Sequence, residues 1–161
     1  TGVFDVVQTA FNYSLLWQEA RYEIFPTAKK HDIGIICSAP LQQGSLAVRR
    51  DELIENGAPW ISKPRREQFK ALYSFLDEIG MSIVELSLRF VLSNPDIDCV
   101  LVGAKNLKEI TETVAYSEKG PLSEDILKRI EEIYMMVPFR PTLEPILLPW
   151  GDTRPDIGWI V

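Results

Sequence analysis

Short apolar runs alternate along this chain with segments in which apolar residues recur at helical spacing. Three runs, at residues 3–10, 33–38 and 99–102, are rich in β-branched residues and are predicted to be strands. The i, i+3, i+4 recurrence of apolar residues predicts helices elsewhere. The predicted helices cover residues 25–31, 64–79, 82–92, 106–116 and 123–136.

Local signals fix several of these boundaries. Ser82 with Glu85, and Asn106 with Glu109, have the spacing of capping boxes, so a helix is predicted to begin at each pair. Gly80 is expected to end the helix before it. Residues 39–62 hold two prolines and two glycines and are predicted to form a long irregular connection, a length that usually carries function.

The order of these elements is strand, helix, strand, two helices, strand, two helices. Strands separated by helices are parallel and joined by right-handed crossovers. Two α/β architectures follow: a small open sheet, or the last three strand–helix units of an eight-fold barrel. In both, functional groups gather at the carboxyl ends of the strands. Those ends carry Gln8, residues 38–44 and residues 103–106.

Composition narrows the class of protein. The net charge of −6 argues against a nucleic-acid partner, and no apolar run approaches the length that crosses a bilayer. Cys37 and Cys99 both lie in apolar runs and are predicted to be buried, reduced thiols. With no signal-like start, they favour a cytoplasmic location. The lone His31 makes a metal site unexpected.

Two strand–glycine segments point to an anion. Gly103 follows an apolar run, Lys105 comes next but one, and a helix opens at Asn106. Free N–H groups and the positive dipole end at a helix start favour a phosphate. The segment 33–46 also runs from a strand into a glycine, Gly44. Two such segments in one acidic chain favour a phosphate-bearing cofactor. Taken singly, Gly44 is also explained by turn formation, and Lys105 by a solvated surface lysine.

Other side chains offer less. Gln8 lies late in a strand built for burial, so its amide is expected to pair either with a ligand amide or with neighbouring backbone. Ser38 lacks the G-x-S-x-G setting of a nucleophile. Among the carboxylates, only Asp5 stands in an apolar stretch. No catalytic residue is assigned.

Three stretches resemble the aldo-keto reductase family. FDVVQTAFN at 4–12 is similar to that family's sixth barrel strand, and HDIGIICSAPLQQGSL at 31–46 to the seventh strand and its loop. Residues 82–114 are similar to its seventh helix, eighth strand and cofactor-binding helix. The resemblance covers about residues 3–135. It implies the C-terminal part of a (β/α)₈ TIM barrel that binds NADP or NAD and transfers a hydride.

The resemblance also implies roles for the nicotinamide half of the site. Gln8 matches the glutamine that holds the nicotinamide carboxamide. Ser38 stands where an aromatic ring often stacks on the nicotinamide, and Ala39 where a serine often binds the pyrophosphate. Leu41 and Gly44 match the phosphate loop.

The adenosine half matches residues after the third strand. Gly103, Ala104 and Lys105 match the strand-end motif that meets the adenosine phosphate. Glu112 matches an adenine contact, and Thr113 stands where asparagine is usual. Glu109 occupies a position where glutamine or arginine is common. Its charge repels a 2′-phosphate while Lys105 attracts one, so the preference between NADP and NAD stays open.

The family's catalytic tetrad of Asp, Tyr, Lys and His lies on the first half of the barrel, outside this chain. Residues 1–136 are therefore expected to be the NAD(P)(H)-binding portion of an oxidoreductase for a small carbonyl or alcohol substrate. The missing half of the barrel or another subunit is the expected partner. The alternatives are a non-catalytic cofactor-sensing or interaction module on an incomplete barrel, and an unrelated phosphate-binding domain. Residues 137–161 contain five prolines, with Trp150 and Trp159, and are predicted to pack on the barrel or a partner.

Overall fold

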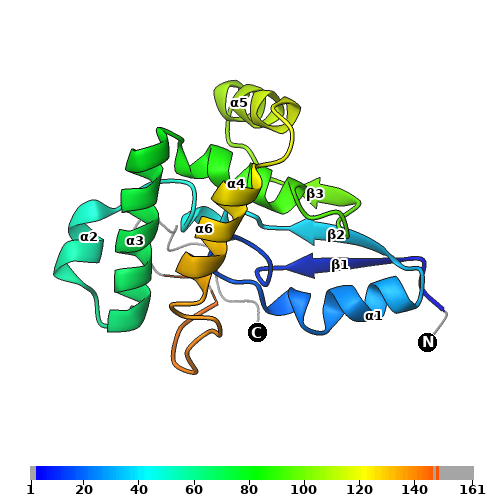
Figure 1. The fold of residues 1–161 in the computed structure, drawn as a ribbon, viewed down its shortest axis with the longest axis horizontal. Helices are drawn as coiled ribbons and strands as arrows, with labels where there is room; N and C mark the ends of the chain where they lie inside the picture. Colours follow the sequence, from blue (N-terminus) through cyan, green and yellow to red (C-terminus); the bar gives the residue numbers. More distant parts are fainter. Residues whose placement is uncertain (1–2, 147, 149–161) are drawn as a thin grey trace.

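The computed structural model describes residues 3–146 and 148. Within them, β1 (Val6–Ala10), β2 (Gly34–Ser38) and β3 (Cys99–Leu101) form one parallel sheet in the order β1-β2-β3 (Figure 1). The three predicted strands and their parallel arrangement are confirmed. The first strand begins three residues later than the sequence predicts.

Helices connect the strands as expected. The 3-10 turn η1 (Glu19–Arg21) and α1 (Ile24–Lys30) lie between β1 and β2, while α3 (Lys63–Ile79) and α4 (Ile83–Leu92) lie between β2 and β3. After β3 come α5 (Leu107–Glu118) and α6 (Glu124–Tyr134). Ser82 accepts a hydrogen bond from the Glu85 N–H (3.1 Å), so the predicted cap of α4 is confirmed.

The connection from 39 to 62 is more ordered than the sequence predicts. It contains the 3-10 turn η2 (Gln42–Gly44) and the short helix α2 (Asp51–Asn56). A helix of six residues is unstable alone. Here Arg66 of α3 donates to the carbonyl oxygens of Ile54 and Glu55 near the end of α2, and Ile54 is buried. Tertiary contacts that the local pattern does not encode therefore stabilise this helix.

The two faces of the sheet differ sharply. One face packs on the core through Val7, Thr9, Ile35, Cys37 and Val100. Side chains alternate along a strand, so Val6, Gln8, Cys99 and Leu101 belong to the other face, where all four are exposed. Cys37 is buried as predicted. The prediction that Cys99 is buried is wrong, because its side chain lies on this second face and is exposed.

The core lies between the covered face and the helices. Phe69, Leu72, Phe75 and Leu76 of α3 are buried, as the helical spacing predicts, and α6 contributes Ile130, Ile133 and Tyr134. The segment after α6 returns to this core: Val137, Glu144 and Leu148 are buried. Trp150 and Trp159 lie outside the described residues.

Candidate functional site

The carboxyl ends of β1 and β2 bring together two of the predicted site residues. The register pairs Gln8 with Ile36 and Ala10 with Ser38, so both side chains stand on the same face. Gln8 Nε2 donates to Ser38 Oγ (2.7 Å), and Ser38 Oγ donates to the Thr9 carbonyl oxygen (3.1 Å). The expectation that Gln8 is buried is wrong. Its side chain is exposed on the uncovered face, where a ligand can reach its amide.

The loop after β2 holds an unusual backbone. Ala39, Gln42 and Gln43 have positive φ values of 58°, 48° and 51°. Each costs about 1 kcal/mol or more for a residue with a Cβ, and such strain clusters at functional sites. Gly44 follows at φ 94°, and a Cβ built there would meet nothing within 4 Å. Leu41 and Gly44 thus lie on a tight turn with open space beside the glycine, as the backbone approach of a phosphate requires.

The segment after β3 is exposed, and the Glu109 carboxylate already bonds there. Asn106 Oδ1 accepts from the Glu109 N–H (3.0 Å), which confirms the predicted cap. Glu109 Oε2 accepts from the Lys105 N–H (2.7 Å), and Oε1 accepts from Asn106 Nδ2 (3.1 Å). The Glu109 carboxylate therefore occupies one of the backbone donors that a phosphate would use. Gly103, Ala104 and Lys105 are exposed.

The other two predicted residues on α5 are engaged within the helix. Thr113 Oγ1 donates to the Glu109 carbonyl oxygen (2.8 Å), and Glu112 lies 3.7 Å from the Lys108 ammonium. Both side chains are half-buried. They lie on α5, whereas Gly103, Ala104 and Lys105 precede that helix.

Gln42 was not singled out by the sequence, where it is one of two glutamines in the loop after β2. The structure buries it. Its Nε2 donates to the Phe11 carbonyl oxygen (3.0 Å) and to Ser14 Oγ (3.0 Å), while its Oε1 is buried without a partner among the described residues. Gln42 therefore ties the loop after β2 to the loop after β1. In the sequence, only its place beside the turn after β2 could have indicated this role.

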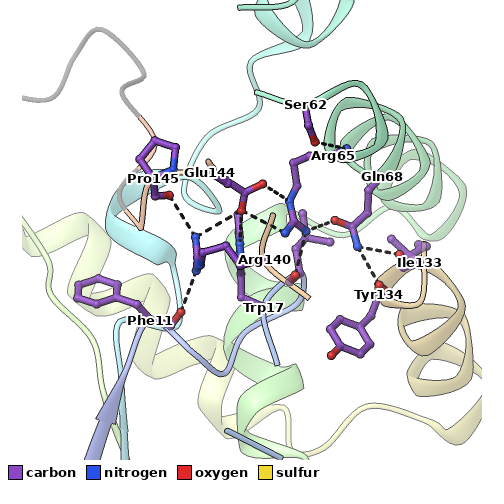
Figure 2. Close-up of polar contacts among 11 residues, drawn as sticks. Phe11, Trp17, Ser62, Arg65, Gln68, Ile133, Tyr134, Arg140, Glu144 and Pro145 are labelled. Atoms are coloured by element: carbon purple, nitrogen blue, oxygen red, sulfur yellow. Dashed lines mark hydrogen bonds and ion pairs between the residues drawn. The ribbon is translucent and has the colours of Figure 1, made fainter. Parts of the chain in front are cut away.

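A buried ionic cluster, also absent from the prediction, fixes the segment after α6 (Figure 2). Glu144 accepts from Arg65 Nε (2.8 Å), Arg65 Nη2 (3.1 Å) and Trp17 Nε1 (2.8 Å). Arg65 also donates to the Leu16 carbonyl oxygen (3.1 Å). The sequence favoured Asp5 as the carboxylate in an apolar setting, but Asp5 is exposed. The better signal was Glu144 inside the apolar run from 143 to 148.

Arg140 joins this cluster to the strand ends. Its Nη2 donates to the Phe11 carbonyl oxygen (3.2 Å), and its Nη1 donates to Pro145 O (3.2 Å) and Glu144 Oε1 (3.4 Å). Its guanidinium lies 5.1 Å from the centre of a Trp17 ring, over which Arg65 also lies at 4.6 Å. Burial lowers the pKa of Arg140, and the nearby Glu144 carboxylate opposes that shift.

Other features of the described residues lie apart from this edge of the sheet. A cavity of about 410 Å³ between α1, α4 and α6 is lined by Tyr13, Phe25 and Phe90, and none of the predicted site residues borders it. Among residues 3–146 and 148, no group of three His, Cys, Asp or Glu side chains is placed to hold a metal ion. No helix there is both long and apolar enough to span a membrane.

Comparison with known proteins decides the family. The model of the Aldo/keto reductase family matches residues 1–135. The chain belongs to this family. Its parallel strands alternating with helices are accordingly part of a (β/α)₈ barrel.

Individual relatives of this aldo-keto reductase chain are distant. It is 24% identical over 141 residues to the uncharacterized oxidoreductase YrpG of Bacillus subtilis, with 80% of the chain and 40% of the relative covered. It is 27% identical over 138 residues to L-galactose dehydrogenase of Arabidopsis thaliana, with 82% and 41% covered. A probable voltage-gated potassium channel subunit beta of the same plant is 26% identical over 136 residues, with 74% and 40% covered. The chain thus spans about 40% of the length of these relatives.

Proposed function

We propose that this chain is the NAD(P)(H)-binding portion of an oxidoreductase that transfers a hydride between nicotinamide and the carbonyl or alcohol carbon of a small substrate. One observation carries the proposal. The Gln8–Ser38 pair lies near the carboxyl ends of β1 and β2, and the strained loop ending at Gly44 and the exposed Gly103–Lys105 segment follow β2 and β3, which neighbour each other in the parallel sheet. Ligands of α/β folds bind at that edge.

In this proposal each part of the edge receives one part of the dinucleotide. Gln8 holds the nicotinamide carboxamide, and Ser38 orients the Gln8 amide through the 2.7 Å hydrogen bond instead of stacking on the ring. The backbone of Ala39, Leu41 and Gly44 receives the pyrophosphate, since the space beside Gly44 is open.

The adenosine end falls to the segment after β3. Gly103, Ala104 and Lys105 receive the adenosine phosphate, and Glu112 and Thr113 contact the adenine. A Cβ built on Gly103 would meet nothing within 4 Å, so the backbone is open to a phosphate there as well. Glu109 must share or release the Lys105 N–H when an anion binds.

Hydride transfer to a carbonyl needs an acid at the carbonyl oxygen. The bound dinucleotide supplies the hydride, and this chain supplies its binding surface. We assign the acid to polypeptide that completes the barrel, on the same chain or another subunit. We also place the protein in the cytoplasm, a proposal supported by the free thiols of Cys37 and Cys99.

A second function is a cofactor-sensing or interaction module without turnover. One observation favours it, the similarity to a probable potassium channel subunit beta. In that case dinucleotide binding would be present and hydride transfer absent.

The test is titration of the complete protein with NADPH and NADH, followed by tryptophan fluorescence. Gly44→Ala should weaken binding at least severalfold, because it places a Cβ in the open space where the pyrophosphate lies and strains a φ of 94°. Gly80→Ala is the matched control. Gly80 also has a positive φ (64°) and open space, but it ends α3.

If both substitutions weaken dinucleotide binding equally, the assignment of the pyrophosphate to the loop at Gly44 is refuted. Absence of binding by the unmodified protein would refute the proposal altogether. Binding without reduction of any of a panel of aldehydes and ketones would favour the second function.

A further inference from the structure

Three segments meet at the carbonyl oxygen of Phe11, the residue that follows β1. It accepts from Gln42 Nε2 of the loop after β2 (3.0 Å) and from Arg140 Nη2 of the segment after α6 (3.2 Å). A carbonyl oxygen has two lone pairs, so these bonds use its full accepting capacity. Phe11 itself has a φ of 64°, a left-handed conformation that a phenylalanine rarely adopts.

The donor from the loop after β2 lies on a turn that local backbone hydrogen bonds close, and its side chain ties that turn to the loop after β1. Gln42 has a φ of 48°, and its Nε2 bonds only Phe11 O and Ser14 Oγ among the described residues. Its Oε1 is buried with no partner there. The Phe11 carbonyl and the Ser14 hydroxyl are therefore the two groups through which the Gln42 side chain fixes this turn against the loop after β1.

The donor from the segment after α6 is held firmly. Arg140 donates to Glu144 and Pro145, and Glu144 is fixed in turn by Arg65 and Trp17 (Figure 2). Docking of residues 140–145 therefore delivers a positioned guanidinium to Phe11. Without it, the Phe11 carbonyl keeps only the bond from Gln42, so its strained backbone is held less tightly and the link to the loop after β2 is weaker.

We propose that Arg140 is a positioning residue that couples the docking of residues 140–145 to the shape of the loop at 39–44. Docking presets that loop for the pyrophosphate and so raises dinucleotide affinity. This rests on the proposed function. Coupling between binding sites is reciprocal, so bound dinucleotide also stabilises the docked segment by the same factor.

The experiment uses the complete protein with three substitutions. Arg140→Ala removes the donor to Phe11. Arg140→Lys keeps the charge beside Glu144 and one donor. Leu143→Ala is the control, because Leu143 lies in the same segment, is 94% exposed and makes none of these hydrogen bonds.

Two readouts are taken. Amide hydrogen exchange at residues 39–46 is measured without ligand, and the Kd for NADPH is measured by fluorescence. Arg140→Ala should speed exchange at 39–46 and raise Kd by about fivefold or more, within the usual range of coupling between sites. Arg140→Lys should recover part of both effects, and Leu143→Ala should match the unmodified protein.

The proposal is overturned if Arg140→Ala leaves exchange at 39–46 unchanged, or if Leu143→Ala changes exchange and Kd as much as Arg140→Ala does. If Arg140→Ala does not fold, Arg140→Lys alone must speed exchange at 39–46, and normal exchange in it refutes the coupling. Failure of the unmodified protein to bind NADPH refutes the proposed function, whereas the exchange measurement still tests the link from Arg140 to the loop.

Discussion

Replacing Glu144 with leucine probes the buried ionic cluster most directly. The Glu144 side chain is 1% exposed, the Arg65 side chain is 0% exposed, and their closest atoms are 2.8 Å apart. Glu144→Leu leaves the Arg65 guanidinium buried without its carboxylate and Trp17 Nε1 without its acceptor. Removing one partner of a buried pair costs about 3–5 kcal/mol. The free energy of unfolding should therefore fall by about that amount.

The chain offers a control of nearly the same geometry. Arg129 and Glu132 are 2.7 Å apart on α6, with side chains 49% and 51% exposed. An exposed pair contributes about 0–1 kcal/mol, because water solvates both charges whether or not they meet. Glu132→Leu should therefore cost no more than about 1 kcal/mol, although its ion pair is the shorter one.

A double substitution separates the unpaired charge from the lost contacts. Arg65→Met with Glu144→Leu removes both charges, so it should cost less than the sum of the two single changes. Urea unfolding, followed by tryptophan fluorescence and far-ultraviolet circular dichroism, measures all four variants. If Glu144→Leu costs no more than Glu132→Leu, or if the double change equals the sum, burial of the pair does not set its energetics.

Two further predictions concern charge. Glu109→Gln keeps a side chain that can complete the cap of α5 but removes the negative charge beside Lys105. The ratio of the Kd for NADPH to the Kd for NADH, measured by fluorescence titration, should therefore fall by about two- to fivefold. An unchanged ratio would place the 2′-phosphate elsewhere. Burial raises the pKa of Cys37 to about 12, so on raising the pH the unfolded chain loses this proton at a lower pH than the folded chain does. The free energy of unfolding should therefore be fully retained below about pH 9 and decline between pH 9 and 12. Cys37→Ala should lose less stability over that interval in urea unfolding, and an equal loss would rule out this thiol as a source of the decline.

Elements specified by local sequence were predictable. Parallel strands follow from short apolar runs separated by helices, and α4 and α5 begin where Ser82 and Asn106 cap them. The strand ends that carry the candidate site were predictable for the same reason, because parallel strands place their carboxyl ends together.

Features that depend on distant contacts were not predictable. Helix α2 is held by Arg66 of α3, which bonds its carbonyl oxygens, and the buried Glu144 is paired with Arg65, far away in the sequence. Gln8 and Cys99 were expected to be buried because they lie in apolar strands. Their exposure depends on what covers the second face of the sheet, and the pattern of one strand does not contain that information.

The match to the family model ends at residue 135, yet the carboxylate that neutralises Arg65 lies at residue 144. The family match therefore ends before the residue that neutralises the buried Arg65 charge. A protein shortened at residue 135 would retain every described strand and helix, yet it would leave the buried Arg65 guanidinium over the Trp17 ring without its carboxylate. A shortened version of this protein should therefore extend at least to Glu144, the counter-ion of the buried Arg65.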